Sequence, residues 1–237
     1  MRAAFNRQSL GCELPLNVVD LWFAKLPEMD FSLEAVLSVD EMRRASRFRF
    51  DRDAANFVAR RGILRLILAT YTAVPPSQLS FTQNQFGKPA LDGCFCNIRF
   101  SLSKSGELAV YAVARLRDLG VDLEHFGQMP LEISSIAGSF FCERQIAVLK
   151  DTPADQKEEM FLRLWTQLEA QGKASGIGIG RLNSASSGLN AFPGRCFSFT
   201  RLVPTPGYAV AVAVQGRRRC SLRTIGFHIP LHTARSK

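Results

Sequence analysis

Two apolar stretches with the same alternating pattern lie far apart in the chain. Leu108–Arg115 reads Leu-Ala-Val-Tyr-Ala-Val-Ala-Arg, and Tyr208–Val214 reads Tyr-Ala-Val-Ala-Val-Ala-Val. Short apolar runs of this kind are typical of strands buried in a sheet. The order strand, helices, strands therefore occurs twice, on either side of about Asp118. This pattern predicts an α+β fold in which two similar halves, 1–118 and 119–237, pack together.

The first half begins with a predicted strand at Val18–Ala24. Ser38 and Glu41 have the spacing of a capping box, which predicts a helix that begins near Val39 and runs through the Arg43–Arg49 region. A second helix is expected to follow it and to end before the next pair of prolines.

Asp51 is predicted to cap that second helix, which ends at Pro75-Pro76. Arg61 and Arg65 lie four apart on a face beside its apolar stripe, and we interpret Arg65 as a structural ion pair. The stripe is formed by Phe57, Leu64, Ile67, Leu68 and Tyr71.

The chain then predicts a loop at Phe86–Pro89 and a strand at Asn97–Leu102. Ser103–Gly106 reads as a tight polar turn before the strand at 108–115, and Arg117-Asp118 reads as another. These turns precede the first stretch that contains candidate metal-binding residues.

That stretch is Leu119–Glu124. Val121 and Leu123 alternate with Asp122 and Glu124, which predicts a short strand whose two carboxylates share a face. Like charges side by side repel unless a cation lies between them, and carboxylate oxygens are suited to Mg²⁺. The alternative is that both carboxylates belong to the solvated face of an edge strand.

In the second half, helices are predicted at Ile133–Lys150 and Asp155–Ser175, followed by a Gly-rich turn at Gly176–Gly180 and a strand at Cys196–Thr200. The buried stripe of the second of these helices is expected to contain Phe161, Leu164, Trp165 and Leu168. Glu169 and Lys173 lie four apart at the edge of that stripe. They form either part of a site or a helix-stabilising pair.

Composition narrows the function classes. The net charge of +9 favours an acidic partner, such as nucleic acid, a phosphorylated ligand or an acidic protein. The sequence lacks a zinc finger, an RNP-like aromatic pattern and a basic helix run, so a nucleic-acid-binding module ranks last.

Six cysteines without a CxxC pair argue against structural zinc and fit a reduced, cytoplasmic setting. No apolar run is long enough to span a membrane or to form a signal peptide.

Several short motifs resemble, in order and spacing, those of the Sfp-type 4′-phosphopantetheinyl transferases. The resemblance covers most of the chain, from about Val18 to Val214. The matching pieces are Asp20-Leu21-Trp22, Arg61–Arg65, Phe86–Pro89, Phe100–Ser105, Gly120–Glu124, Phe140-Phe141 and Trp165–Ala170 with Lys173-Ala174.

The resemblance implies a fold and an activity. Members of the family are pseudodimers of two α+β halves, with coenzyme A and Mg²⁺ in the cleft between them. They move the phosphopantetheine arm of coenzyme A onto a serine of an acyl or peptidyl carrier protein and release adenosine 3′,5′-bisphosphate. The implied partner is an acidic carrier domain, which the basic chain suits, and two-halved members act as monomers.

The resemblance also implies roles for residues of the second half. Asp122, Glu124 and Glu169 would hold the Mg²⁺. Glu169 would in addition help to deprotonate the carrier serine, because a hydroxyl is a poor nucleophile until a base takes its proton. Lys173 would contact the phosphates and steady the leaving group.

The first half would then form the side that binds the nucleotide of coenzyme A. Arg61 lies where the family has a basic residue for the 3′-phosphate. Gly87, Lys88 and Pro89 match the loop that lies against the nucleotide, although Lys88 could equally be a solvated turn lysine. Ser103 and Lys104 match a Ser-His pair that touches the 3′-phosphate and pyrophosphate region.

Five positions depart from the family pattern. Lys104 replaces a histidine, Leu168 replaces a lysine expected to face phosphate, and Gln145 stands where the family often carries glutamate. Gln171 and Gly172 replace residues that are usually bulkier and apolar. These departures predict weaker coenzyme A binding and keep open an alternative, a weakened or inactive homologue that binds coenzyme A or carrier protein.

Overall fold

The computed structural model describes residues 14–26, 33–95, 97–127, 133–180, 196–204 and 206–227. Its strands are β1 (Val18–Lys25), β2 (Phe81–Gln83), β3 (Pro89–Leu91), β4 (Ile98–Ser105), β5 (Leu108–Arg115), β6 (Leu119–His125), β7 (Phe197–Leu202), β8 (Tyr208–Gln215) and β9 (Ser221–Phe227). Its α-helices are α1 (Val39–Ala45), α2 (Asp51–Thr72), α3 (Ile133–Phe140), α4 (Glu143–Asp151) and α5 (Lys157–Ser175). Short 3₁₀ helices lie at Glu34–Val36, Pro76–Gln78, Gly93–Phe95 and Ala154–Gln156.

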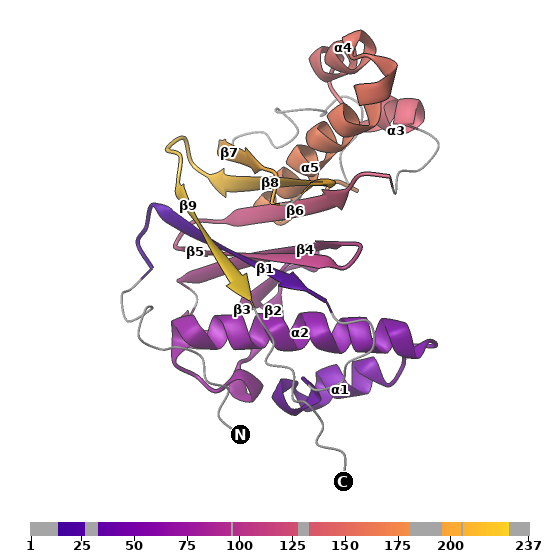
Figure 1. Cartoon of the computed structure of the whole chain (residues 1–237). Helices are drawn as coiled ribbons and strands as arrows, with labels where there is room; N and C mark the ends of the chain where they lie inside the picture. Colours follow the sequence, from indigo (N-terminus) through magenta and orange to yellow (C-terminus); the bar gives the residue numbers. More distant parts are fainter. Residues whose placement is uncertain are drawn as a thin grey trace.

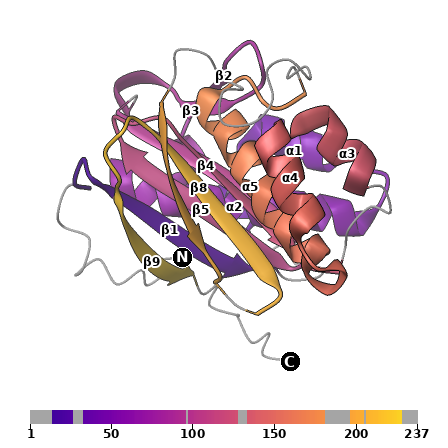
Figure 2. The same ribbon diagram turned by 90° about the horizontal axis from the view of Figure 1, so that it is seen from above.

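The elements form layers: α2, a four-stranded sheet, a three-stranded sheet and α5 (Figure 1). The first sheet has the order β4-β5-β1-β9, and the second has the order β6-β8-β7. Seen from above, α5 runs along the outside of the second sheet with α3 and α4 beside it (Figure 2). The predicted α+β architecture of two halves is confirmed.

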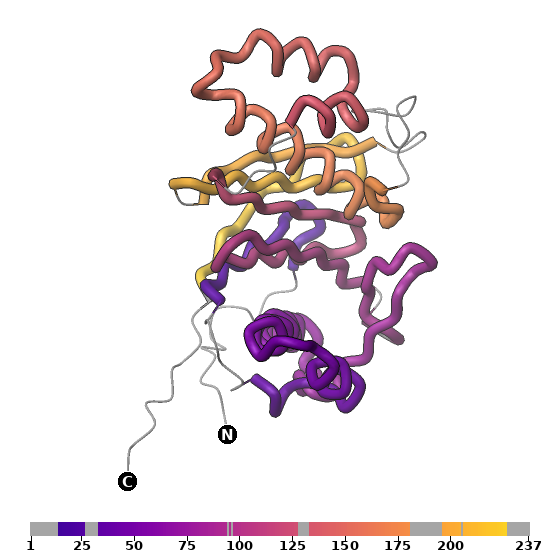
Figure 3. The backbone as a smooth tube through the Cα atoms, turned by 90° about the vertical axis from the view of Figure 1, so that its right-hand side faces the viewer, coloured from indigo at the N-terminus to yellow at the C-terminus, as the bar shows by residue number. Residues whose placement is uncertain are grey.

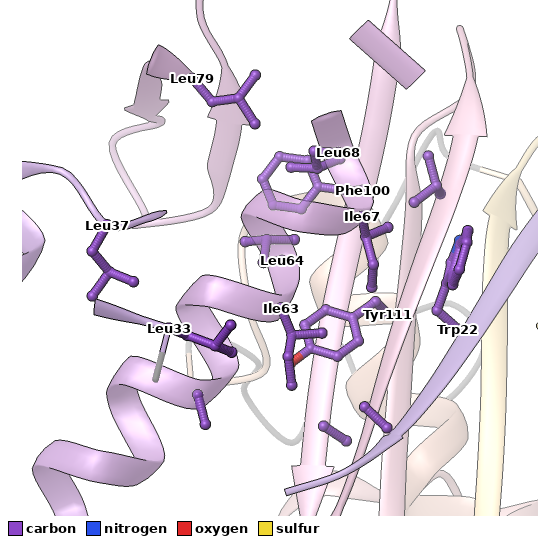
Figure 4. Packing of buried hydrophobic residues seen from close by; sticks show 14 of the residues in the cluster. Trp22, Leu33, Leu37, Ile63, Leu64, Ile67, Leu68, Leu79, Phe100 and Tyr111 are labelled. Carbon is purple, nitrogen blue, oxygen red and sulfur yellow. The ribbon is translucent and has the colours of Figure 1, made fainter. Parts of the chain in front are cut away.

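An apolar core fills each space between layers. Between the sheets, alternating side chains of β1, β5, β6 and β8 interlock, including Leu21, Val110, Val121 and Val212. Between α2 and the first sheet, the predicted stripe of α2 meets Trp22, Phe100 and Tyr111, as Figure 4 shows. The tube view separates these layers clearly (Figure 3).

The capping box is confirmed: Ser38 Oγ accepts from the backbone N–H of Glu41, and the Glu41 carboxylate accepts from the N–H of Ser38. The helix it starts ends at Ala45, earlier than predicted. Asp51 is the first residue of α2 and not its cap, because Phe50 occupies the capping position. Burial of the stripe therefore fixes this helix without a side-chain cap.

Two further predictions are corrected. Residues 103–105 belong to β4 and not to a turn, because they pair with β5 through Ser105 opposite Leu108. The predicted helix over 133–150 is two helices, α3 and α4, because the helical conformation is interrupted at Phe141 and Cys142.

Strand β9 had no counterpart among the predicted elements. It runs parallel to β1 and extends the sheet of the first half, with Arg223 opposite Asp20. Arg223 donates to both oxygens of the buried Asp20 carboxylate at 2.7 Å, so this arginine is the counter-ion of a buried acid. The division of the chain at Asp118 remains a prediction. Among the helices in the described ranges, none combines the length and apolarity that a membrane span requires.

Candidate active site

Helix α5 lies directly against β6, and Gly120 makes this possible. A Cβ atom at Gly120 would lie 2.0 Å from the carbonyl oxygen of Ala170 and 2.4 Å from the nitrogen of Ala174. Alanines on α5 and β8 extend the same close contact. This approach brings Glu169 and Lys173 of α5 to the strand that carries Asp122 and Glu124.

Asp122 is the centre of the resulting cluster. Its Oδ1 accepts from Lys173 Nζ at 2.6 Å and from Ser103 Oγ at 2.8 Å, and Lys173 Nζ also donates to Ser103 Oγ at 3.0 Å. Its Oδ2 is buried and has no hydrogen-bond partner. A buried carboxylate oxygen without a donor is costly and is therefore a natural position for a cation.

Glu124 and Glu169 complete a set of three carboxylates. Burial and the nearby Asp122 charge raise the pKa of Glu124 to about 7, although the Ser105 hydrogen bond and Lys173 oppose the shift. Burial and Asp122 likewise raise the pKa of Glu169, against the effect of Lys173. One lysine thus lies among three acidic groups, and the charge of Asp122 disfavours ionisation of the other two.

This donor set fits a hard divalent cation, since only oxygen ligands and an excess of negative charge converge here. Within the residues that the structure describes, no three His, Cys, Asp or Glu side chains are already arranged as metal ligands. Ligation would therefore require side-chain rotation, and Lys173 now supplies the positive charge at Asp122.

A groove with a volume of about 250 Å³ lies beside the cluster, between the two halves. Lys173 lines it from the second half, and Lys88 and Pro89 line it from the first. Its other lining residues are Phe86, Gly87, Phe100, Ser101, Leu102, Gly172, Gly176 and Gly178. The predicted nucleotide loop and the predicted phosphate-binding lysine therefore share one groove.

Lys88 is not a solvated turn residue. Its Nζ donates to the carbonyl oxygens of Leu119 and Ala174 at 3.2 and 3.1 Å, across the junction of the halves. Asn84 joins it there, because Asn84 Nδ2 donates to the carbonyl oxygen of Gly176 at 2.8 Å. These donors satisfy carbonyl groups at the end of α5 that the helix itself leaves without partners.

Two other predicted residues, Arg61 and Lys104, lie outside this cluster. Arg61 pairs with Glu41, and its guanidinium lies 4.2 Å from the ring centroid of Phe81. Lys104 is exposed and alternates along β4 with Ser103, so it points to the opposite face of the strand. The structure thus brings together Ser103, the three carboxylates and Lys173, and leaves these two cations apart.

Comparison with known proteins identifies the family. A model described as the 4′-phosphopantetheinyl transferase superfamily matches residues 118–203, and one described as the N-terminal part of a 4′-phosphopantetheinyl transferase matches residues 21–115. The 4′-phosphopantetheinyl transferase HetI of Nostoc sp. is 38% identical over 209 residues, which are 84% of this chain and 88% of HetI. This chain belongs to the 4′-phosphopantetheinyl transferase superfamily, in its two-halved Sfp-type class.

More distant members of the superfamily also match. The 4′-phosphopantetheinyl transferase psf-1 of Bacillus pumilus is 32% identical over 163 residues, 69% of this chain and 65% of that protein. The human L-aminoadipate-semialdehyde dehydrogenase-phosphopantetheinyl transferase is 28% identical over 193 residues, 75% of this chain and 62% of that protein.

The structure explains three departures from the pattern of the superfamily. Leu168 is buried among the apolar side chains of α3, α4 and α5 and faces no groove. Gln145 accepts from the backbone N–H of Cys142 and so caps α4. Gly172 leaves room for Ile179, whose nearest side-chain atom would lie 2.9 Å from an added Cβ. Each of these residues serves local packing.

Sequence reasoning missed three residues that build the site: Gly120, Asn84 and Ser105. Ser105 Oγ donates to Glu124 Oε2 at 3.1 Å. Its signal was present in the alternation Ser101, Ser103, Ser105, which is the two-residue period of a strand. The turn-like composition of the segment concealed it.

Proposed function

We propose that this chain transfers the 4′-phosphopantetheine arm of coenzyme A to a serine hydroxyl of an apo acyl or peptidyl carrier protein. Membership of the superfamily supports the reaction class. One observation carries the assignment of the site: Asp122, Glu124 and Glu169 converge on Lys173 beside a groove formed by both halves, and one buried Asp122 oxygen lacks a donor.

In this proposal Asp122, Glu124 and Glu169 hold Mg²⁺. When bound, the ion supplies positive charge that offsets the negative charge of the pyrophosphate. The raised pKa values of Glu124 and Glu169 support a cation here, because a positive ion would offset the burial and the negative charge of Asp122 that raise them.

Residues of the chain then accept the proton and stabilise the charge on the leaving group. The carrier serine oxygen attacks the phosphorus that bears the pantetheine arm, and its proton passes to the Glu169 carboxylate. The bond from that phosphorus to the bridging oxygen breaks, and the electron pair leaves with adenosine 3′,5′-bisphosphate. Lys173 stabilises the charge on this leaving group.

The remaining assignments form part of the proposal. Lys88 and Pro89 contact the nucleotide, and Ser103 contacts the pyrophosphate. Lys104 and Arg61, which lie apart from the cluster, contribute positive charge for the 3′-phosphate region. The net charge of +9 suits an acidic carrier domain. We further propose that the protein acts as a monomer in the cytoplasm.

The test is transfer to a carrier protein. The chain is incubated with coenzyme A, Mg²⁺ and several apo carrier proteins, and each carrier is weighed by mass spectrometry. We expect one carrier or more to gain the phosphopantetheine mass, and we expect chelation of the metal or Asp122→Asn to abolish the gain. Asp118→Asn is the matched control, since this half-exposed carboxylate pairs with Arg99 outside the cluster.

No mass gain on any carrier would contradict the activity. Coenzyme A binding without transfer would instead support the alternative of an inactive homologue. Transfer that survives Asp122→Asn would contradict the metal assignment while leaving the activity intact. No contact in the described residues favours the inactive alternative, because Leu168 and Gln145 lie in packing and capping positions.

A further inference from the structure

Three serines on β4 join the edges of the two sheets. β4 is the edge strand of the first sheet and β6 is the edge strand of the second. Ser101, Ser103 and Ser105 alternate along β4, so their hydroxyls share the face toward β6. Their contacts on β6 are the N–H of Val121, the Asp122 carboxylate and, for Ser105, two groups near the end of the strand.

Ser105 differs from the other two because its hydroxyl accepts from the backbone of β6 and also donates to a carboxylate of the same strand. Ser105 Oγ accepts from the backbone N–H of His125 at 3.0 Å and donates to Glu124 Oε2 at 3.1 Å. A hydroxyl has one proton, so accepting from the strand backbone directs that proton to the carboxylate. The side chain is only 8% exposed, and water therefore competes little for either bond.

This contact has a consequence for Glu124. A glutamate side chain has several rotatable bonds. Ordering this side chain when a cation binds costs conformational entropy, which weakens the binding of the cation. A carboxylate has two oxygens and several lone pairs, so one serine bond leaves capacity for a cation. A hydrogen bond from a rigid strand therefore prepares the carboxylate for ligation without blocking it.

We propose that Ser105 is a positioning residue, which restricts the conformations of the Glu124 carboxylate and so reduces the rearrangement that this side chain needs to bind the divalent cation. This inference rests on the proposed metal role of Asp122, Glu124 and Glu169. It assigns to Ser105 a function that the packing of β4 on β6 does not require.

Ser101 provides a matched control for packing. Its Oγ accepts from the N–H of Val121 at 3.1 Å, and its side chain is 7% exposed. Ser101→Ala and Ser105→Ala therefore remove the same buried hydroxyl from the same strand and leave one N–H of β6 without its acceptor. Only Ser105→Ala also removes a carboxylate contact.

The experiment measures Mn²⁺ binding to the chain by electron paramagnetic resonance without coenzyme A, because Ser101 also lines the groove. We expect Ser105→Ala to raise the Kd for Mn²⁺ about tenfold or more, as loss of a contact behind a metal ligand commonly does. Ser101→Ala should leave the Kd near that of the wild type, and Ser105→Thr, which keeps the hydroxyl, should largely restore it. Urea unfolding without metal should show similar stability losses for the two alanine variants.

Transfer kinetics give a second measurement. With Ser105→Ala, the Mg²⁺ concentration at half-maximal rate should rise, while the rate at saturating Mg²⁺ should stay close to that of the wild type. Equal Mn²⁺ Kd values for Ser105→Ala and wild type, or equal weakening by Ser101→Ala, would overturn the role of Ser105 alone. A wild-type chain that binds no Mn²⁺ would overturn both this role and the proposed metal site.

Discussion

Two buried clusters of charge in the described part of the chain differ in how completely their groups are paired. In the first half, Glu41 accepts from Arg61, from Arg65 at 2.6 Å and from the N–H of Ser38. Arg65, whose side chain is 2% exposed, also donates to two backbone carbonyls. Burial alone would raise the pKa of Glu41, but these hydrogen bonds outweigh it and the pKa is lowered.

The cluster at Asp122 has the opposite character. Three carboxylates share one lysine, one buried oxygen of Asp122 has no partner, and the pKa values of Glu124 and Glu169 are raised. The first cluster is complete within the chain and stabilises the fold. The second leaves an excess of negative charge beside a groove, which is typical of a site that binds a ligand. Pairing, more than burial, separates a structural cluster from a functional one.

The largest expected effect is on catalysis. Glu169→Gln should lower the rate of transfer by about 10²–10⁴, because it removes both a metal ligand and the proposed base. The free energy of unfolding should not fall, since the change removes a repelling charge. Carrier modification followed over time by mass spectrometry measures the rate, and urea unfolding measures the stability.

Glu159→Gln is the control for this change. Glu159 lies on the same helix, is half-exposed, and pairs with Arg163 one turn away. Its loss should alter neither rate nor stability appreciably. A Glu169→Gln variant within twofold of the wild-type rate would remove the distinction between the two clusters.

At the complete cluster the expected effect is on stability. Glu41→Gln should lower the free energy of unfolding by roughly 3 kcal/mol, because Arg65 is then left as a buried charge without a counter-ion. Urea unfolding at neutral pH measures it. Asp40→Asn, one residue earlier in α1, breaks an exposed pair with Arg43 and should cost less than about 1 kcal/mol. Equal losses in both variants would contradict the structural role of Glu41.

Gly120→Ala tests how the open cluster is assembled. The added Cβ collides with backbone atoms of α5, so the helix must move away from β6. We expect a stability loss of about 1–3 kcal/mol and a decrease in transfer at saturating substrates. Gly138→Ala is the control, since an added Cβ there meets nothing within 4 Å and alanine favours the helix. A fully active Gly120→Ala variant would show that the close approach is unnecessary.

The smallest expected effect concerns pH. Because the folded pKa of Glu41 lies below its unfolded value, the stability it contributes is present above about pH 4.3 and is lost as pH falls through the folded pKa. The stability difference between wild type and Glu41→Gln should therefore shrink as the pH falls below about 4.3. Urea unfolding across this range measures it, and a difference independent of pH would contradict the assignment.

Much of the fold follows from local pattern. The alternation of Leu108–Arg115 and Tyr208–Val214 predicted β5 and β8, and the spacing of Ser38 and Glu41 predicted the start of α1. These signals are readable because neighbours in sequence are also neighbours in structure. β9 was missed for the converse reason: its partner β1 lies about two hundred residues earlier, and Arg223 gains its meaning only from the buried Asp20.

The same contrast holds for the candidate site, where some features follow from the local sequence and others only from tertiary contacts. The sequence by itself determined the chemical groups: two carboxylates on one face of a strand, and Glu169 and Lys173 one turn apart on a helix. It could not determine their partners. Lys173 was a candidate for a helical pair with Glu169, yet its Nζ donates to Asp122 and Ser103.

The tertiary structure decided this, because Gly120 lets α5 approach β6 until the ammonium meets a carboxylate that is more deeply buried. It also turned an apparent polar turn into the strand end from which Ser105 reaches Glu124. Hydrogen bonds and charge pairs depend on distance in space, and the packing of the two halves sets that distance.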